Sequence, residues 1–188
     1  MNLSKYFLLM FSGAIALLVS GCSGGGASTT NNVTGVAATG AAINGTVCLQ
    51  DAAIHEVCMK TADGHYSFDV TGLTPPFILK ASWNDNGITK ELYSMAAGKG
   101  VANISPLTNA IVTVAATVAP ATLYATPTLT AMQAAASNLS AATTKIITSL
   151  APLLQEFAVS TDVNPITTTY NVNHAGLDGF LDLSLIHI

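Results

Sequence analysis

The spacing of apolar residues changes once along this chain, near Ser105, and this change constrains the fold more than any other feature. Before it, apolar and polar side chains alternate in short runs separated by turn residues, which is typical of strands with one buried face. After it, apolar residues recur every three or four positions, as in a helix with one buried stripe. The sequence therefore predicts an α+β chain, with a small antiparallel β-sandwich over 33–104 and an all-α helical region over 105–183.

The strands are predicted from the alternation and from the turns between them. Asp63-Gly64 and Asn86-Gly87 supply two of the turns, because these residue pairs adopt the backbone angles of tight turns readily. The predicted strands are residues 45–51, 57–61, 66–70, 77–83 and 88–95.

Helix start signals occur twice after the change of period. Ser105-Pro106 suits an N-cap followed by the first helical position, and Pro120 marks the end of that helix. Thr126-Pro127 repeats the start signal. A third, short helix is predicted over 176–183.

A stripe of apolar residues runs from Leu129 to Phe157 at alternating spacings of three and four. We interpret it as the buried face of a helix, because the flanking positions lack the charges of a coiled-coil seam, which is the alternative. Pro152 is expected to kink the last turns. The segment Asn138-Leu139-Ser140 is expected to interrupt the helix.

The N-terminus has the three parts of a secretory signal. Lys5 precedes a short apolar run over 6–19, and small residues then lead to Cys22. The run is too short for a membrane-spanning helix. The sequence Val19-Ser20-Gly21-Cys22 resembles the lipobox of bacterial lipoproteins, which implies a signal peptide over 1–21 and acylation of Cys22. The alternatives are an ordinary secretory signal with an incidental cysteine and an N-terminal membrane helix.

Residues 22–32 have the Gly, Ser, Thr and Asn composition of a flexible tether. With an acylated Cys22, they would hold the folded part away from the bilayer. In lipoproteins of two-membrane bacteria, Asp after the cysteine favours retention in the inner membrane. Ser23 at that position therefore predicts a lipoprotein anchored in the outer membrane.

Positive charge is scarce in this chain, which has six lysines, no arginine and a net charge of −4. Nucleic-acid binding needs clustered Lys and Arg side chains, so nucleic acid is not an expected partner. The sequence contains no phosphate loop, dinucleotide fingerprint or Gly-x-Ser-x-Gly elbow. We expect no cofactor, no metal and no catalytic residues.

Two cysteines remain when Cys22 is acylated. Cys48 and Cys58 form an even pair in an exported, oxidising setting, which predicts a disulfide. If the predicted strands 45–51 and 57–61 pair, both cysteines lie on the same polar face within bridging reach. A zinc site is not predicted, because a second Cys or His pair is missing.

Two segments of the first half carry a family resemblance. Gly40-Ala41-Ala42-Ile43-Asn44-Gly45-Thr46-Val47 and Thr61-Ala62-Asp63-Gly64-His65-Tyr66-Ser67-Phe68 resemble the carboxypeptidase regulatory-like module, a transthyretin-like sandwich. The resemblance implies an accessory module without catalytic residues of its own. The paired cysteines and Asn44 depart from the usual pattern.

Two further segments resemble a group of bacterial envelope lipoproteins without an established activity. These segments are residues 103–109 and Gly176-Leu177-Asp178-Gly179-Phe180-Leu181-Asp182. In that group the chain continues past the second segment into further β-structure. We therefore interpret residues 184–188 as non-native and expect a longer native protein, the alternative being a natural short C-terminal strand.

A few side chains invite a chemical interpretation, and each has a simpler one. His55-Glu56 begins like a zinc-protease motif, but Met59 replaces the second histidine and the local period is that of a strand. Trp83 and Tyr93 flank a turn and suit a sugar platform, although core positions are the favoured interpretation.

The polar residues near the C-terminus invite a similar comparison. His174 lies near Asp178 and Asp182 in the sequence, as in a metal or acid–base cluster. We favour a helix-start role for Asp178 and an exposed turn for Asp182. His65 is expected to lie in a solvated turn.

Three hypotheses about function remain open at this point. The first is a non-catalytic, lipid-anchored envelope protein whose sandwich binds or spaces a protein or glycan partner. The second is the N-terminal fragment of a larger lipoprotein enzyme or transport component. The third is a helical scaffold that oligomerises through the stripe from Leu129 to Phe157.

Overall fold

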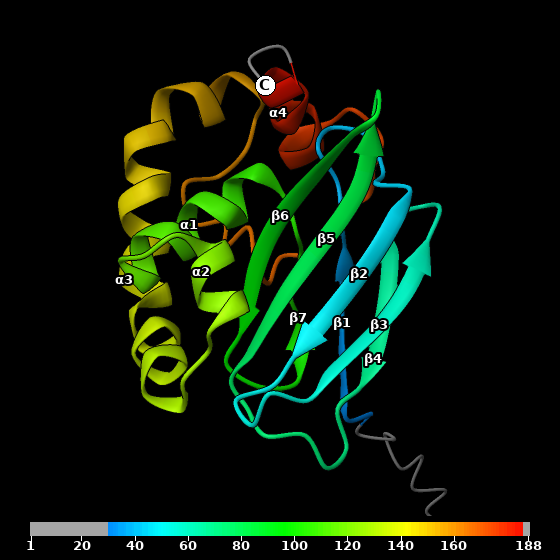
Figure 1. Ribbon diagram of the computed structural model, residues 1–188. Coiled ribbons are helices and arrows are strands. Elements are labelled where there is room, and N and C mark those ends of the chain that lie inside the picture. The colour runs from blue at the N-terminus through cyan, green and yellow to red at the C-terminus, as the bar shows by residue number, and fades with distance from the viewer. Residues whose placement is uncertain (1–29, 186–188) are drawn as a thin grey trace, which may run out of the picture.

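The computed structural model describes residues 30–185 and confirms a mixed α+β fold. Within these residues seven strands come first and four helices follow, and Figure 1 shows how they are arranged. The elements are β1 (Asn32–Val36), β2 (Gly45–Gln50), β3 (Glu56–Thr61), β4 (His65–Asp69), β5 (Phe77–Asp85), β6 (Ile88–Ala96), β7 (Gly100–Val101), α1 (Pro106–Ala116), α2 (Pro120–Ala125), α3 (Leu129–Glu156) and α4 (Gly176–Leu185). All five predicted strands are present, and β1 and β7 are additional.

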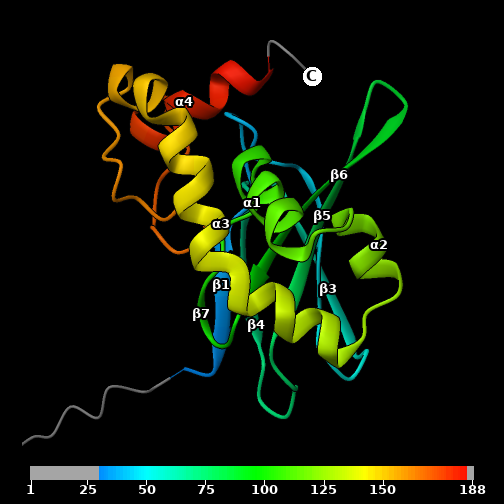
Figure 2. The ribbon, with the colours of Figure 1, turned by 90° about the vertical axis from the view of Figure 1, so that its left-hand side faces the viewer.

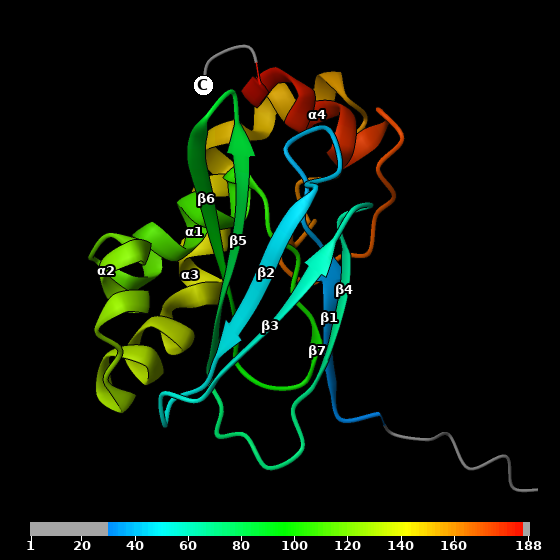
Figure 3. The same ribbon diagram turned by 45° about the vertical axis from the view of Figure 1, so that its right-hand side comes forward.

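The strands form two sheets. One has the order β4-β1-β7 and the other the order β3-β2-β5-β6, and Figure 3 shows the two side by side. All the pairs are antiparallel except β1 with β7, which is parallel. The sheets enclose an apolar core in which alternate residues of β5 such as Leu79 and Ala81 are fully buried.

The four-stranded sheet is covered on both faces. Leu79 faces the sandwich core, whereas its neighbour Ile78 belongs to a second apolar cluster with residues of α1, α2 and α3. Both side chains are 0% exposed. Because successive side chains point to opposite faces of a strand, this pattern means that the helices pack onto the sandwich rather than stand apart from it.

Helix α1 begins as predicted. Ser105 is the N-cap, with an extended backbone, and its hydroxyl accepts a hydrogen bond from the backbone N–H of Thr108. The Thr108 hydroxyl in turn accepts from the Ser105 N–H at 2.8 Å. This reciprocal cap satisfies two helix-end donors, and Pro106 follows at the first helical position.

The region between the first two predicted helices differs from expectation. The prediction that Pro120 ends the first helix is wrong, because α1 ends at Ala116 with a left-handed backbone at Thr117, and Pro120 begins α2, a helix of six residues. The next helix, α3, starts two residues after the predicted signal, because Thr128 is its N-cap and accepts a hydrogen bond from the Ala131 N–H. A proline in the first turn of a helix costs little stability, because the backbone N–H that it lacks would have no partner within the helix at that position.

Helix α3 is continuous over 28 residues, so the expected interruption at Asn138-Leu139-Ser140 is wrong. The Asn138 amide donates instead to the backbone carbonyl of Ala115 in α1. Figure 2 shows α3 crossing the molecule, with α4 near its C-terminal end. In the part of the chain described here, none of the helices has the length and apolarity needed to cross a bilayer.

The buried face of α3 follows the predicted stripe from Met132 to Leu150 and departs from it at Leu129 and Leu153. Leu129 and Leu153 belong to the stripe but are 46% and 43% exposed. Met132 and Leu154 are fully buried near the same two ends. A straight helix drifts by about 20° per seven residues relative to a 3.5-residue repeat, so by the C-terminal end the buried position has moved from Leu153 to Leu154, whereas Leu129 is exposed as the first residue of the helix.

Candidate functional site

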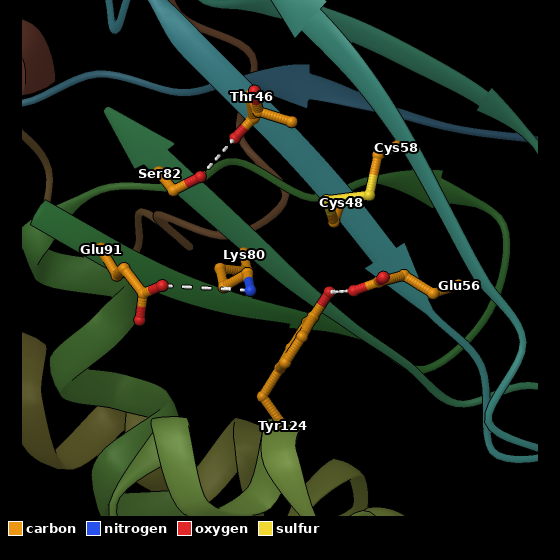
Figure 4. Close-up of a disulfide and its surroundings, with 8 residues drawn as sticks. All are labelled: Thr46, Cys48, Glu56, Cys58, Lys80, Ser82, Glu91 and Tyr124. Carbon is orange, nitrogen blue, oxygen red and sulfur yellow. Dashed lines mark hydrogen bonds and ion pairs between the residues drawn. A yellow bond between two sulfur atoms is a disulfide. The ribbon is translucent and has the colours of Figure 1, made fainter. Parts of the chain in front are cut away.

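The predicted disulfide is present. Cys48 and Cys58 are directly opposite each other in the β2–β3 ladder, and their sulfur atoms are 2.05 Å apart. Figure 4 shows the bond on the face of the sheet that α2 covers. The predicted acylation site, Cys22, lies outside the described residues.

Charged and aromatic side chains surround the disulfide (Figure 4). The Tyr124 hydroxyl of α2 donates to the Glu56 carboxylate of β3. The Lys80 ammonium lies 4.4 Å from the centre of the Tyr124 ring and 3.9 Å from a Glu91 oxygen. Burial raises the pKa of Tyr124, and the hydrogen bond to Glu56 raises it further. These contacts fasten α2 to the sheet.

Glu56 also completes a trio with the two cysteines. Its carboxylate and the two sulfur atoms lie within 4.8 Å of one another, which is metal-ligand spacing. The two sulfur atoms are bonded to each other in the Cys48–Cys58 disulfide, so the oxidised chain has no thiolate at either position to bind a metal.

The structure brings His174, Asp178 and Asp182 together, in structural roles. One Asp178 oxygen accepts hydrogen bonds from the backbone N–H groups of Asn173 and His174, both at 2.7 Å, which supports the predicted role at the helix start. The His174 ring pairs with Asp182 at 3.0 Å. The expectation of an exposed turn at Asp182 is wrong, because Asp182 lies within α4 and is half-buried.

The other singled-out side chains are placed apart. Tyr93 of β6 pairs directly with Lys80 of β5, and paired residues share a face of the sheet. Trp83 follows Lys80 by three positions on β5, and an odd separation along a strand changes the face. Trp83 and Tyr93 therefore point to opposite faces of the β5–β6 pair. They therefore form no common platform. Tyr93 is buried, and Trp83 is half-buried against the sandwich core.

The other two histidines of the described residues lie at strand starts. His55 directly precedes β3 and bonds to Asp51 through its ring, which agrees with a strand rather than a zinc-protease helix. His65 is exposed, as expected, and is the first residue of β4.

A groove runs along α3 and was not predicted. It consists of two cavities of about 370 and 340 Å³, which share Ser140 and Asn164. The first cavity, here called the apolar half, lies between α3, the end of β6 and the segment after α3. Its lining includes Met95, Ala96, Ala136, Leu139 and Ile166.

The second cavity, here called the hydroxyl half, lies between α3 and residues 161–164. Its lining includes Ser140, Thr143, Thr144, Thr148, Thr161 and Asp162. Together the two halves are called the α3 groove. Hydroxyl residues spaced by three and four positions on α3 are the sequence signal from which this polar wall could have been predicted. Thr143 also falls at the spacing of the predicted apolar stripe from Leu129 to Phe157.

Thr143 differs from the other hydroxyl residues of the groove. It is only 7% exposed, and its hydroxyl has no hydrogen-bond partner among the described residues. The nearby Thr144 hydroxyl, by contrast, donates to the backbone carbonyl of Ser140. A buried hydroxyl without a partner costs about 1–3 kcal/mol, so Thr143 is a locally unfavourable residue of this wall.

The molecule is thus an α+β protein with a structural disulfide on its sheet and a two-part groove beside its longest helix. No family model, no curated protein and no solved structure matches the chain.

Proposed function

We propose that this chain is a non-catalytic, lipid-anchored protein of the bacterial cell envelope that binds a protein or glycan through the α3 groove. The observation that carries the binding part is the groove itself, a pair of joined cavities of about 370 and 340 Å³. Volumes of about 300–1,000 Å³ are usual for ligand sites. The four-stranded sheet supports the groove, because α3, which forms one wall of the groove, packs on this sheet together with α1.

The anchoring part rests on the N-terminal sequence. The apolar run, the small residues before Cys22 and the polar segment after it resemble a lipoprotein leader and tether. The outer membrane is the proposed location because Ser23 follows the cysteine. The transthyretin-like identity of the sandwich belongs to the same proposal and is supported by two facing sheets of short strands.

An oligomeric helical scaffold finds less support. Along its middle, the stripe of α3 packs inside the molecule, where Thr143 is nearly buried and Leu139 and Ile146 contact the core. Of the large apolar residues in the stripe, only Leu129 and Leu153 are substantially exposed.

Acylation is tested by labelling with an alkyne fatty acid in an expressing bacterium. We expect the wild-type chain to take up the label and Cys22→Ser to lose it, because acylation requires the Cys22 thiol. The double variant Cys48→Ser/Cys58→Ser is the matched control and should remain labelled. Label that persists in Cys22→Ser would contradict lipid anchoring.

Binding through the groove is tested on peptide and glycan arrays. Ser140 is exposed and lies where the two halves meet, so Ser140→Trp is expected to block any ligand that fills the groove. Ser137→Trp, on the same helix but outside both cavities, is the control. A ligand that binds both variants equally well binds elsewhere.

A further inference from the structure

We propose that Cys48, Cys58 and Glu56 together bind one Zn²⁺ ion when the disulfide between the two cysteines is reduced. The disulfide and the metal site are then alternative states of one patch on the four-stranded sheet, which Figure 4 shows in its oxidised state. This inference goes beyond the proposed function and does not depend on it.

The backbone holds the three side chains on one face of the sheet. Cys48 of β2 is directly opposite Cys58 of β3, and paired residues share a face. Glu56 precedes Cys58 by two positions on β3 and therefore shares that face. The two sulfurs and a Glu56 carboxylate oxygen lie within 4.8 Å of one another. The β2–β3 ladder extends from Gly45 to Gln50, so backbone hydrogen bonds keep the cysteines opposite each other after reduction.

The donor set selects zinc among the common metals. Zinc is bound by cysteine sulfur and by carboxylate oxygen, and three protein ligands with water in the fourth position form the usual open zinc site. Calcium and magnesium take oxygen ligands, whereas copper(I) prefers sulfur ligands. The sequence argued against zinc by its number of Cys and His residues alone, and the Glu56 carboxylate is the third ligand that such a count leaves out.

Tyr124 and Lys80 complete the surroundings of the three ligands. The Tyr124 hydroxyl donates to one Glu56 oxygen, which leaves the other oxygen for the metal, and hydrogen bonds of this kind orient metal ligands. Lys80 is directly opposite Cys48 on β5 and shares its face. Zn²⁺ with two thiolates and one carboxylate carries a single net negative charge, which the Lys80 ammonium balances.

The site is open to solvent on one side, because Cys58 and Glu56 are exposed while Cys48 is 7% exposed. The reductant is a dithiol, whose first thiolate attacks the Cys58 sulfur and releases the Cys48 thiolate. Its second thiolate then displaces Cys58, so the dithiol becomes a disulfide and two electrons and two protons pass to the cysteines. Zn²⁺ displaces the two thiol protons as the two zinc–sulfur bonds form.

The test adds Co²⁺ to the full-length protein, because cobalt in a zinc site gives tetrahedral and thiolate-to-metal absorption bands that zinc lacks. The protein is reduced with a phosphine, which is removed under argon before the titration. We expect the reduced wild type to bind one Co²⁺ with both sets of bands and to release it to Zn²⁺, which binds such sites more tightly. The oxidised wild type should show neither set of bands.

Three variants identify the ligands. Cys48→Ser/Cys58→Ser retains Cys22 and should lose the bands. Glu56→Gln should weaken Co²⁺ binding by at least about tenfold, because it removes a charged ligand. Glu91→Gln changes a carboxylate that faces Lys80 but lies outside the trio. It is the matched control, since it removes the same charge, and it should bind like the wild type.

Zn²⁺ should also raise the thermal unfolding midpoint of the reduced wild type and leave that of the oxidised protein unchanged, because only the folded strands hold the three ligands together. Bands of equal strength in Cys48→Ser/Cys58→Ser would overturn the inference, because they would place the metal elsewhere. Equal Co²⁺ affinity of Glu56→Gln and the wild type would also overturn it, since two thiolates bind metal in an unfolded reduced chain as well.

Discussion

Asp51 joins two parts of the chain, the turn at 51–55 and the loop at Thr74, through one buried carboxylate. Its oxygens accept hydrogen bonds from the backbone N–H groups of Ala53, His55 and Thr74 at 2.8–2.9 Å, and one of them bonds the His55 ring. Desolvation acts to raise the pKa of Asp51, but these hydrogen bonds outweigh it and leave the pKa below its ordinary value. The charged form is therefore the one that the fold stabilises.

The first prediction concerns pH. The pKa of Asp51 is lower in the folded protein than in the unfolded chain, so its charged form adds to the free energy of unfolding. This contribution is fully present above the unfolded pKa of about 3.9 and is lost as the pH falls through the folded pKa. Asp51→Asn is expected to cost about 1.5–3 kcal/mol at pH 7. Thermal unfolding midpoints measured from pH 7 to acid should fall less steeply for Asp51→Asn than for the wild type.

Asp85→Asn is the control for this experiment, because Asp85 is exposed at the β5–β6 turn. Its pH profile should match that of the wild type. Parallel acid profiles for Asp51→Asn and the wild type would show that Asp51 does not contribute through its charge.

At the scale of elements, the start of α1 covers the outer edge of β6. The Asn109 side-chain oxygen accepts a hydrogen bond from the Tyr93 N–H at 3.1 Å, and the Thr108 hydroxyl donates to the Tyr93 carbonyl. An uncovered strand edge invites pairing with other chains. Two helix side chains thus complete the hydrogen bonding of this strand where a further strand would otherwise be needed.

The second prediction concerns this covered edge. Asn109→Ala removes the acceptor of the Tyr93 N–H in a buried position and should cost about 1–3 kcal/mol in the free energy of unfolding. Asn109→Asp retains an acceptor oxygen of the same geometry and should cost much less. Urea denaturation of both variants measures the difference. Equal losses would mean that the Asn109 amide N–H groups, rather than its oxygen, matter.

At the scale of the whole molecule, the sandwich and the helices share a core. One cluster of buried residues extends from Val33 and Leu49 in the sheets to Ile147 and Leu154 in α3. Asn103 adds a polar link, because its amide donates to the carbonyls of Pro165 and Thr168. The helical region and the sandwich are therefore expected to unfold together.

The third prediction tests this shared core with two adjacent leucines of α3. Leu154 is 0% exposed and Leu153 is 43% exposed. Leu154→Ala should cost about 2–5 kcal/mol, and Leu153→Ala should cost much less. In Leu154→Ala, helical circular dichroism and hydrogen-exchange protection of β2 and β5 should fall in one transition. Loss of the helical signal at lower denaturant would contradict a single cooperative unit.

Local patterns predicted much of this fold. Alternation predicted the strand pair that carries Cys48 and Cys58, and Ser105-Pro106 predicted the start of α1. The exposure of Leu153 was not predicted, because a stripe spaced by three and four residues does not show how a straight helix rotates. The buried outer face of β5 depends on helices that follow later in the chain.

The α3 groove was harder to predict than the fold. Its hydroxyl residues on α3 are visible in the sequence, but the cavity exists only because residues 161–164 return beside the helix. Thr143 looked like part of an apolar stripe, and nothing local indicates that its hydroxyl is buried without a partner. Such a site depends on contacts between distant segments.

The place of β1 has a mechanical consequence. This strand is the first element of the described chain and the middle strand of its sheet, hydrogen-bonded to β4 on one side and β7 on the other. A force that pulls on the chain through Thr30 therefore loads both ladders at once, along the strand direction. Hydrogen bonds loaded together in shear resist more force than bonds peeled one by one from an edge strand. A protein tethered at this end would therefore bear the pulling force on the strand of this sheet that is hardest to separate from its neighbours.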